Sequence, residues 1–324
     1  AGSEVTASTS DVLVTAPGGN QAFLFSNLQY WDVPAPRPHQ YVVDSISNCG
    51  GINVGGLELT GDEGDKIEVV TGIQDFNGDG RNDYALASPN TGKVYVVFRR
   101  EEALEGDISL RLLALAPSNR EGLDGLLVTG EPGFGTSLAT VDLNGDGSDD
   151  LVIGNPLASG GQGEFVVLFS RSGLDTPEGG FSVSELLAES RCGPVRTAAR
   201  IRGWTHDLSR FGVNVANAGD LDGDGDDELL VAAPEATPRF DPDPADGVDE
   251  LSQPGIDLNE DGIADNPWPV DSAGLVYVVS GASRFDSTWS CSGSDRLCNP
   301  NSECAEGQEC VVPDPSRCAP HVCV

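Results

Sequence analysis

Short apolar runs that end in proline occur four times along this chain. Each is followed by a glycine-containing turn and a second apolar run rich in Val, Tyr and Phe. Short runs of this composition, bounded by Gly, Asn and Pro, are typical of β-strands. The pattern therefore predicts four strand pairs: DVLVTAP (11–17) with QAFLF (21–25), DYALASP (83–89) with KVYVVF (93–98), DLVIGNP (150–156) with EFVVLF (164–169), and ELLVAAP (228–234) with LVYVVS (275–280).

The four prolines that close these runs recur about every 70 residues, which indicates an internal repeat. Helical periodicity is scarce, and its best candidates are two short connectors, 101–106 and 182–190. A period well above 40 residues with several strands per unit fits propeller blades better than a solenoid coil. We therefore predict an all-β fold, a β-propeller of about four units. The expected units are 1–50, 51–115, 116–192 and 193–285, the last with an acidic insertion at 235–272.

An acidic loop precedes three of the four proline-ended runs, and the first unit lacks it. The loops are DFNGDGRND (75–83), DLNGDGSDD (142–150) and DLDGDGDDE (220–228). Each has an acidic or amide residue at positions 1, 3, 5 and 9, and glycine at positions 4 and 6. Carboxylates this close repel one another unless a cation lies among them.

Calcium suits this donor set, because it takes six to eight oxygen ligands in flexible geometry. Side-chain oxygens at alternating positions of a curved loop can face one centre, and glycine at position 6 permits the sharp bend. Position 7 contributes its backbone carbonyl. At position 9, Glu228 is one methylene longer than Asp83 and Asp150 of the other two loops. The assigned ligands are Asp75, Asn77, Asp79, Arg81 and Asp83; Asp142, Asn144, Asp146, Ser148 and Asp150; and Asp220, Asp222, Asp224, Asp226 and Glu228.

Acidic loops of this kind also occur in EF-hands and in metal-free turns. An EF-hand needs a bidentate Glu at position 12 between two helices, but here Leu86, Ile153 and Val231 hold that position inside an apolar run. Asp-Gly turns that join strands without any metal remain the alternative. The recurrence of one spacing before three equivalent strands favours calcium, with a Kd of about 10⁻⁴–10⁻³ M as in extracellular modules.

A further loop, DLNEDGIAD (257–265), repeats the same positions inside the acidic insertion. Its candidate ligands are Asp257, Asn259, Asp261 and Asp265. No apolar strand follows it directly, since two prolines intervene. We predict a fourth calcium site here, with a merely solvated acidic loop as the alternative.

Two stretches carry a family resemblance: FGTSLATVDLNGDGSDDLVIGNP (134–156) and FGVNVANAGDLDGDGDDELLVAAP (211–234). They resemble the FG-GAP repeats of integrin-alpha-type β-propellers, with Phe-Gly at the start and GNP or AAP in the place of GAP. The second unit lacks the FG and the first keeps only its later strands, so the resemblance covers about residues 10–285. It implies a calcium ion in a hairpin loop of several blades, and adhesion or protein–protein contact at the cell surface. The loop at 257–265 resembles those of bacterial surface proteins, so a bacterial secreted or surface form is expected.

Charge and composition narrow the choice of partner and compartment. The formal net charge of −34 argues against nucleic acid and anionic membranes. No apolar run reaches 18 residues, so no membrane-spanning helix is predicted. The start at AGSEV without Met is what removal of a secretory signal peptide leaves, and we expect a secreted or cell-surface protein.

The segment 286–324 holds six of the eight cysteines and has no strand or helix pattern. We predict a disulfide-stapled tail in an oxidising compartment. Zinc is the rival, but no CxxC pair occurs and only His321 lies nearby. Cys49 and Cys192 remain for a pair across a long gap, and the connectivity stays open.

The sequence bears on three classes of function: an enzyme, a binding module and a structural subunit. The three histidines accompany neither a G-x-S-x-G elbow nor an HExxH helix, so we predict a protein that is not an enzyme. The favoured function is that of a calcium-binding propeller for adhesion or protein contact. The candidate contact patch is RIRGWTHDLSRF (200–211). The alternative for this segment is that Trp204 packs between blades. The alternative is a filament or surface-layer subunit, because the first unit has no strand before Asp11 and a neighbouring copy of the chain can donate one. A calcium-dependent hydrolase ranks below both.

Overall fold

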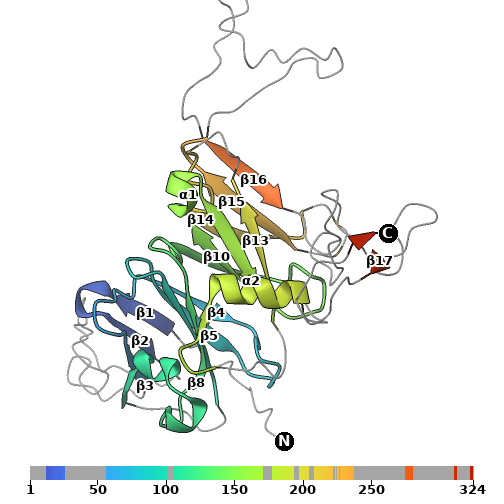
Figure 1. The fold of residues 1–324 in the computed structure, drawn as a ribbon. Helices are drawn as coiled ribbons and strands as arrows, with labels where there is room; N and C mark the ends of the chain where they lie inside the picture. Colours follow the sequence, from blue (N-terminus) through green and yellow to red (C-terminus); the bar gives the residue numbers. More distant parts are fainter. Residues whose placement is uncertain are drawn as a thin grey trace, which may run out of the picture.

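Four β-sheets follow one another along the chain and pack face to face in a computed structural model of the protein (Figure 1). The structure describes residues 12–25, 56–100, 106–170, 177–192, 197–203, 208–221, 223, 225, 227–236, 274–279, 310–311 and 322–323. The first sheet, in spatial order, contains β1 (Val12–Ala16), β2 (Gln21–Phe25), β3 (Gly56–Thr60) and β7 (Gly106–Ser109). The second contains β12 (Phe181–Ser182), β8 (Asp124–Thr129), β6 (Lys93–Phe98), β5 (Asp83–Ser88) and β4 (Val69–Ile73). The third contains β13 (Ala198–Arg202), β11 (Glu164–Leu168), β10 (Asp150–Asn155) and β9 (Ser137–Val141). The fourth contains β14 (Asn214–Gly219), β15 (Glu228–Ala233) and β16 (Leu275–Val279).

The four strand pairs expected from the sequence are confirmed. Each proline-ended run forms a strand that pairs antiparallel with the apolar run after it: β1 with β2, β5 with β6, β10 with β11, and β15 with β16. The chain is all-β as predicted, with few helices. A separate short pair joins β17 (Cys310–Val311) to β18 (Val322–Cys323) in the cysteine-rich segment.

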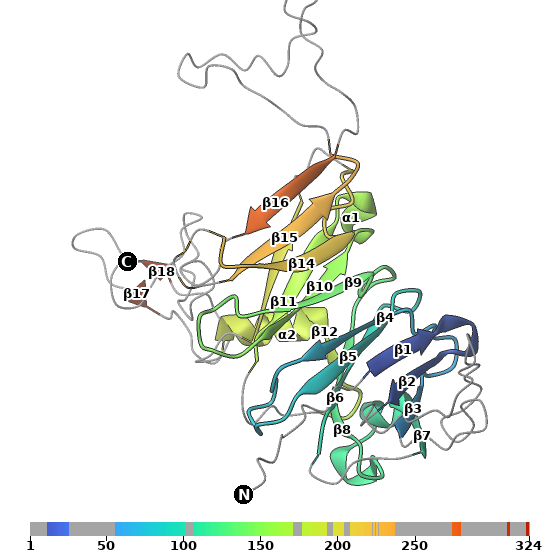
Figure 2. The same cartoon turned by 180° about the vertical axis from the view of Figure 1, so that it is seen from behind.

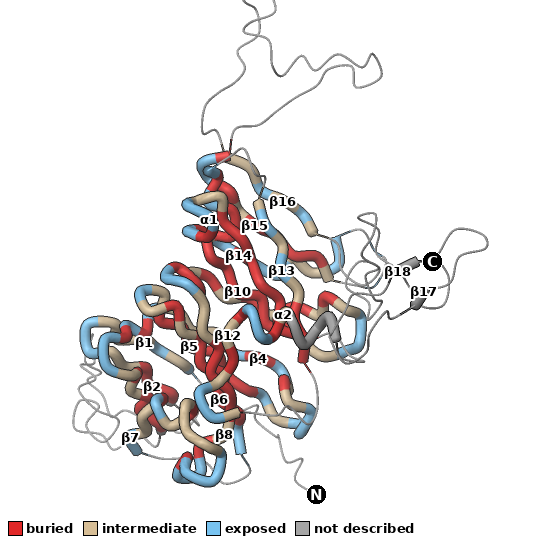
Figure 3. Tube along the Cα trace, in the orientation of Figure 1, coloured by how far each residue is buried: buried red, intermediate tan, exposed pale blue. Residues whose placement is uncertain are grey.

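Apolar side chains fill the spaces between successive sheets, in three hydrophobic cores. Figure 3 shows that the buried residues run along the central strands of the sheets. The two middle sheets are covered on both faces, which explains why β5, β6, β10 and β11 carry apolar residues at successive positions rather than alternating ones. In β10, for example, Leu151 and Ile153 enter the core toward the second sheet, and Val152 enters the core toward the fourth. Each core therefore joins two neighbouring sheets.

The inner edges of the sheets lie side by side, as the blades of a propeller do. β4 contacts β9 and β9 contacts β14, and each of these strands is the edge of its own sheet (Figure 2). In the repeat, β1 corresponds to β5, β10 and β15, which are second strands. Among the described residues, β1 is an edge strand with no hydrogen-bonded strand on its inner side, although it contacts β4. The expected absence of a strand before Asp11 concerns residues outside the described ranges. The described residues form an arc of four sheets.

The outer strands join one unit to the next. β7 follows β6 of the second sheet along the chain but pairs parallel with β3 of the first sheet. β12 follows β11 of the third sheet but pairs parallel with β8 of the second sheet. β3 follows residue 50 and β8 follows residue 115, so the sheets exchange strands across the expected unit boundaries. A repeat in sequence and a sheet in space need not share limits, and the unit boundaries stay a prediction.

Helices are short connectors. α2 (Val183–Cys192) confirms the expected helix at 182–190, and it begins with Ser182 and Glu185 bonded to each other's backbone N–H groups. α1 (Ala158–Gly161) is a four-residue turn. The other helix candidate, 101–106, lies outside the described residues except for Gly106, which begins β7 and is not helical.

The Phe-Gly dipeptides fix each blade against the previous one. Phe134 and Phe211 are buried, and the glycine after each has a positive φ, +89° at Gly135 and +85° at Gly212. A Cβ on Gly212 would lie 2.4 Å from the carbonyl oxygen of Glu164 in the preceding sheet. Glycine is required there by backbone conformation and by close approach together.

Candidate metal centre

The three acidic loops occupy equivalent places in three sheets. Each joins the inner strand to the second strand: 74–82 between β4 and β5, 142–149 between β9 and β10, and 220–227 between β14 and β15. Since the sheets pack in register as blades, the loops lie at the same end of the sheets. The sequence therefore places the same hairpin turn in the second, third and fourth sheets.

The first aspartate of each loop accepts hydrogen bonds from the loop's own backbone. Asp75 accepts from the N–H groups of Asp79 and Gly80, at 2.7 and 2.8 Å. The other two loops repeat this arrangement, from Gly145, Asp146 and Gly147 to Asp142 and from Gly223 and Gly225 to Asp220. Asn77 and Asn144 also accept from the residue at position 5, at 3.0 and 2.9 Å. The same turn is thus formed three times.

Position 6 is the bend of each loop. Gly80 and Gly147 have φ of +85° and +88°, a conformation that L side chains rarely adopt. At position 7, the Arg81 guanidinium lies 3.8 Å from the Asp79 carboxylate, so this side chain is turned toward the loop's acidic residues.

The acidic residue at position 9 is buried in all three loops. Asp83 accepts from the N–H groups of Phe76 and Arg99, both at 2.9 Å. Asp150 accepts from Leu143 at 3.2 Å and Ser170 at 2.9 Å. One carboxylate therefore ties the start of its loop to the chain that leaves the third strand of the sheet, a structural role that the sequence pattern does not reveal.

Burial and neighbouring carboxylates disfavour the charged form of these groups. Burial, with repulsion from Asp79, raises the pKa of Asp83 to about 6. Burial, with repulsion from Asp146 and Asp142, raises the pKa of Asp150 to about 7 despite its two backbone donors. The carboxylates of positions 1, 5 and 9 thus lie close enough to interact, and a cation among them would reverse this electrostatic penalty.

The third loop is described in part. Asp220 and Glu228 are placed, whereas Asp222, Asp224 and Asp226 lie outside the described residues. Glu228 accepts from the Leu221 N–H at 2.7 Å through Oε2, and its buried Oε1 has no hydrogen-bond partner. The expected fourth loop, with Asp257, Asn259, Asp261 and Asp265, lies outside the described residues altogether.

The described residues do not bring a complete acidic cluster together. In the part of the chain that the structure places, no group of three or more His, Cys, Asp or Glu side chains is arranged to hold a metal ion. The donors present are nevertheless all oxygens: carboxylates at positions 1, 5 and 9, an amide at position 3 and a carbonyl at position 7. This set, together with the orphaned Oε1 of Glu228, fits calcium rather than a softer metal.

Other polar features were not foreseen in the sequence. Arg120 is buried and donates to the carbonyls of Leu115 and Gly125. A polar cleft between the second and third sheets contains Arg200 and Arg202, two residues of the candidate contact patch. Trp204 and the three histidines, His39, His206 and His321, lie outside the described residues.

Comparison with known proteins identifies the repeat. The FG-GAP repeat model matches residues 134–168 and 211–248, so the chain carries FG-GAP repeats. It is 33% identical over 170 residues to integrin alpha-PS2 of Drosophila melanogaster, covering 51% of this chain and 10% of that protein. It is 31% identical over 170 residues to integrin alpha-V of Gallus gallus, covering 50% and 13%. A phosphatidylinositol-glycan-specific phospholipase D of Mus musculus is 28% identical over 174 residues, covering 49% and 17%.

These comparisons confirm the FG-GAP, integrin-alpha-like character of the chain. The aligned part spans only about a tenth of the length of the integrin relatives. Among the described residues, no helix has the length and apolar content needed to cross a membrane.

Proposed function

We propose that the chain is a calcium-binding, integrin-alpha-like propeller that acts outside the cell in adhesion or another protein–protein contact and has no catalytic role. One observation carries this proposal: the same acidic turn stands between the first and second strands of three successive sheets. The resemblance of the chain to integrin alpha chains supports the extracellular interaction role. One relative is named a phospholipase, but the acidic residues here are accounted for by the repeated turns.

Calcium would be held by the residues at positions 1, 3, 5, 7 and 9 of each loop. These are Asp75, Asn77, Asp79, Arg81 (carbonyl) and Asp83, and their counterparts in the loops that begin at Asp142 and Asp220. The loop at Asp257 is proposed as a fourth site. When bound, the ion supplies positive charge among carboxylates that otherwise repel one another. The loop backbone supplies the shape, since its own N–H groups already orient the first aspartate.

Calorimetric titration of the chelator-treated protein with calcium tests the proposal. We expect binding at several sites in the range of about 10⁻⁴–10⁻³ M. Asp79→Asn and Asp146→Asn each remove a charge from one loop, so each should remove one site from the stoichiometry. Asp107→Asn is the matched control, because Asp107 is exposed outside the loops and accepts from Thr60 Oγ1. Equal stoichiometry in all three variants would refute the ligand assignment.

A structural role is the second candidate, and the open ends of the sheet array favour it. In the part of the chain that the structure places, β1 pairs with no strand on its inner side, and its Val12 and Val14 are 40% and 45% exposed. In β16, at the other end, Val276 and Val278 are 65% and 57% exposed. A strand donated by a second copy would complete the first sheet and join protomers into a filament or surface layer.

Native mass measurement with and without chelator separates the two candidates. Assemblies that dissociate when calcium is removed would support strand donation. A monomer under both conditions would count against the filament and leave the interaction module.

A further inference from the structure

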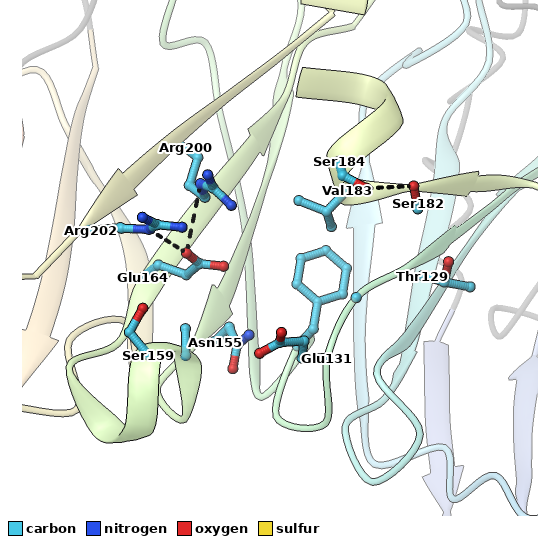
Figure 4. A pocket seen from close by; sticks show the side chains of 13 residues that line it. Thr129, Glu131, Asn155, Ser159, Glu164, Ser182, Val183, Ser184, Arg200 and Arg202 are labelled. Carbon is cyan, nitrogen blue, oxygen red and sulfur yellow. Dashed lines mark hydrogen bonds and ion pairs between the residues drawn. The ribbon is translucent and has the colours of Figure 1, made fainter. Parts of the chain in front are cut away.

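A cleft of about 450 Å³ opens between the second and third sheets (Figure 4). It lies over Phe134 and is lined by the ends of β8 and β10, the starts of α1, β11 and α2, and the outer strand β13. None of the acidic loops contributes to it. β10 begins at an acidic loop and ends at the cleft, so about five strand residues, roughly 17 Å, separate the two sites.

One wall of the cleft carries two arginines that share a single carboxylate (Figure 4). Arg202 and Arg200 approach the same Oε2 atom of Glu164 through their Nε atoms, at 3.3 and 3.8 Å. The structure gives neither guanidinium another partner among the described residues. Since a guanidinium has four further N–H donors on its terminal nitrogens, both arginines keep donors for a second acceptor.

The floor of the cleft contains an amide that lacks a partner. Asn155 is 2% exposed, and its Oδ1 has no hydrogen-bond partner among the described residues. This oxygen is itself buried and lies against Gly133, so a ligand in the cleft does not reach it, and recognition falls to the arginines. Figure 4 shows Asn155 beside Glu131 and below the arginine wall, with Ser182, Ser184 and Thr129 on the opposite wall.

The charges of the cleft contrast with those of the whole chain. Two arginines balance Glu164 and Glu131, whereas the chain carries a formal charge of −34. At physiological salt the Debye length is about 8 Å, so the acidic loops at the other end of β10 contribute little repulsion here. An anionic group can therefore approach this cleft more easily than the rest of this acidic protein.

We propose that this cleft binds an acidic segment of a partner protein, with a carboxylate side chain on the terminal nitrogens of Arg200 and Arg202. The inference rests on the proposed interaction role, and it does not depend on calcium. An Asp or Glu side chain suits this wall, because its two oxygens accept from planar guanidinium donors and it brings a single negative charge. A doubly charged phosphate is less suited, because Glu164 and Glu131 would repel it more strongly than a carboxylate.

Fluorescence anisotropy of a labelled peptide tests this assignment at physiological ionic strength, where the acidic loops are screened. The probe is acetyl-Gly-Asp-Gly-Asp-Gly with a C-terminal dye, and its uncharged counterpart has Asn in place of both Asp residues. We expect saturable binding of the Asp peptide only, with calcium and with chelator alike. Arg202→Gln should weaken binding about tenfold. Arg210→Gln is the matched control, because Arg210 is equally exposed and pairs with Glu235 outside the cleft.

A gain of binding guards against variants that merely misfold. Glu164→Gln removes the carboxylate that competes for the arginines, so it should strengthen binding severalfold, which a damaged fold does not produce. Equal binding of the Asp and Asn peptides would overturn the proposal, as would equal effects of Arg202→Gln and Arg210→Gln. Displacement of the probe by inorganic phosphate at concentrations where acetate has no effect would overturn the carboxylate assignment. Calcium titration of the same protein reports separately on the loops, so failure at one site is distinguishable from failure at the other.

Discussion

The buried aspartates Asp83 and Asp150 each do two things at once. Both oxygens of each carboxylate accept hydrogen bonds from backbone N–H groups. One donor is the second residue of the acidic loop, and the other is a residue just after the third strand of the sheet, Arg99 after β6 or Ser170 after β11. Their exposed neighbours at position 5, Asp79 and Asp146, accept from the backbone N–H two residues on, and Asp79 also pairs with Asn77 and Arg81 of the same loop. The two classes of carboxylate should therefore respond differently to removal, even without calcium.

We expect Asp150→Ala to lower the free energy of unfolding by about 2 kcal/mol in the presence of EDTA, because it leaves the buried N–H groups of Leu143 and Ser170 without an acceptor. Asp146→Ala, in the same loop but exposed, should change it by less than about 0.5 kcal/mol under the same conditions. Urea unfolding of both variants measures the difference. Equal losses would mean that Asp150 has no structural role apart from calcium.

Lys93, at the start of β6, pairs with two acidic residues of the segment between β3 and β4. Its ammonium lies 3.0 Å from Asp62 and 3.3 Å from the buried Asp65, which also accepts from Tyr95 Oη at 2.5 Å and Thr91 Oγ1 at 2.6 Å. Burial by itself would raise the pKa of Asp62, but the hydrogen bond and charge of Lys93 outweigh it, so this pKa is lowered. A lowered folded-state pKa stabilises the fold above the unfolded value of 3.8 and is lost as the pH falls through the folded value.

Lys93→Met should therefore destabilise the protein at pH 7 by about 3 kcal/mol, because it leaves Asp65 buried without its cation. It should also reduce the loss of stability below about pH 4, since Asp62 would no longer have a lowered pKa. Lys66→Met is the control, as Lys66 is exposed and is the chain's other lysine. Chemical unfolding between pH 3 and pH 7 gives both quantities, and identical curves for the two variants would contradict the role of Lys93.

At the scale of elements, the Phe-Gly dipeptide locks one sheet to the next. Gly212→Ala combines an unfavourable φ of +85° with a Cβ only 2.4 Å from the Glu164 carbonyl oxygen. Gly64→Ala has the same φ but open space around the added methyl group. We expect about 1 kcal/mol of destabilisation for Gly64→Ala from conformation alone, and at least about 2 kcal/mol more for Gly212→Ala. Similar thermal midpoints for the two variants would show that the blades do not depend on this close approach.

The sequence predicted the elements that repeat, and for a physical reason. The strands at 83–88, 93–98, 150–155 and 164–168 are buried on both faces, so each is a continuous apolar run that ends at a turn. The outer strands were not predicted, because GDIS in β7 and AARIR in β13 are half-exposed and polar, and the pairing of β3 with β7 joins residues about 50 positions apart. The recurring spacing of acidic residues predicts the loops from the sequence. The cleft has no such signal, because Glu164, Asn155 and Arg202 come together only in the folded chain.

At the scale of the whole molecule, four sheets joined by three cores carry a surface of strongly negative charge. Self-repulsion of this kind keeps a protein soluble but opposes its compact state. Cations bound at the ends of three sheets would reduce that repulsion where carboxylates are densest. Calcium is thus expected to act on the stability of the entire array and not only on the loops.

Thermal unfolding in 5 mM calcium chloride against EDTA, with magnesium chloride as the control cation, tests the calcium assignment most directly. Sites with a Kd of about 10⁻⁴–10⁻³ M contribute about 1–2 kcal/mol each at this concentration, which should raise the Tm by about 5–10 °C. Magnesium should give a much smaller rise, because it requires stricter octahedral geometry and gives up its water reluctantly. An unchanged Tm in calcium would contradict cation binding in the acidic loops, and with it the account of how this propeller is stabilised.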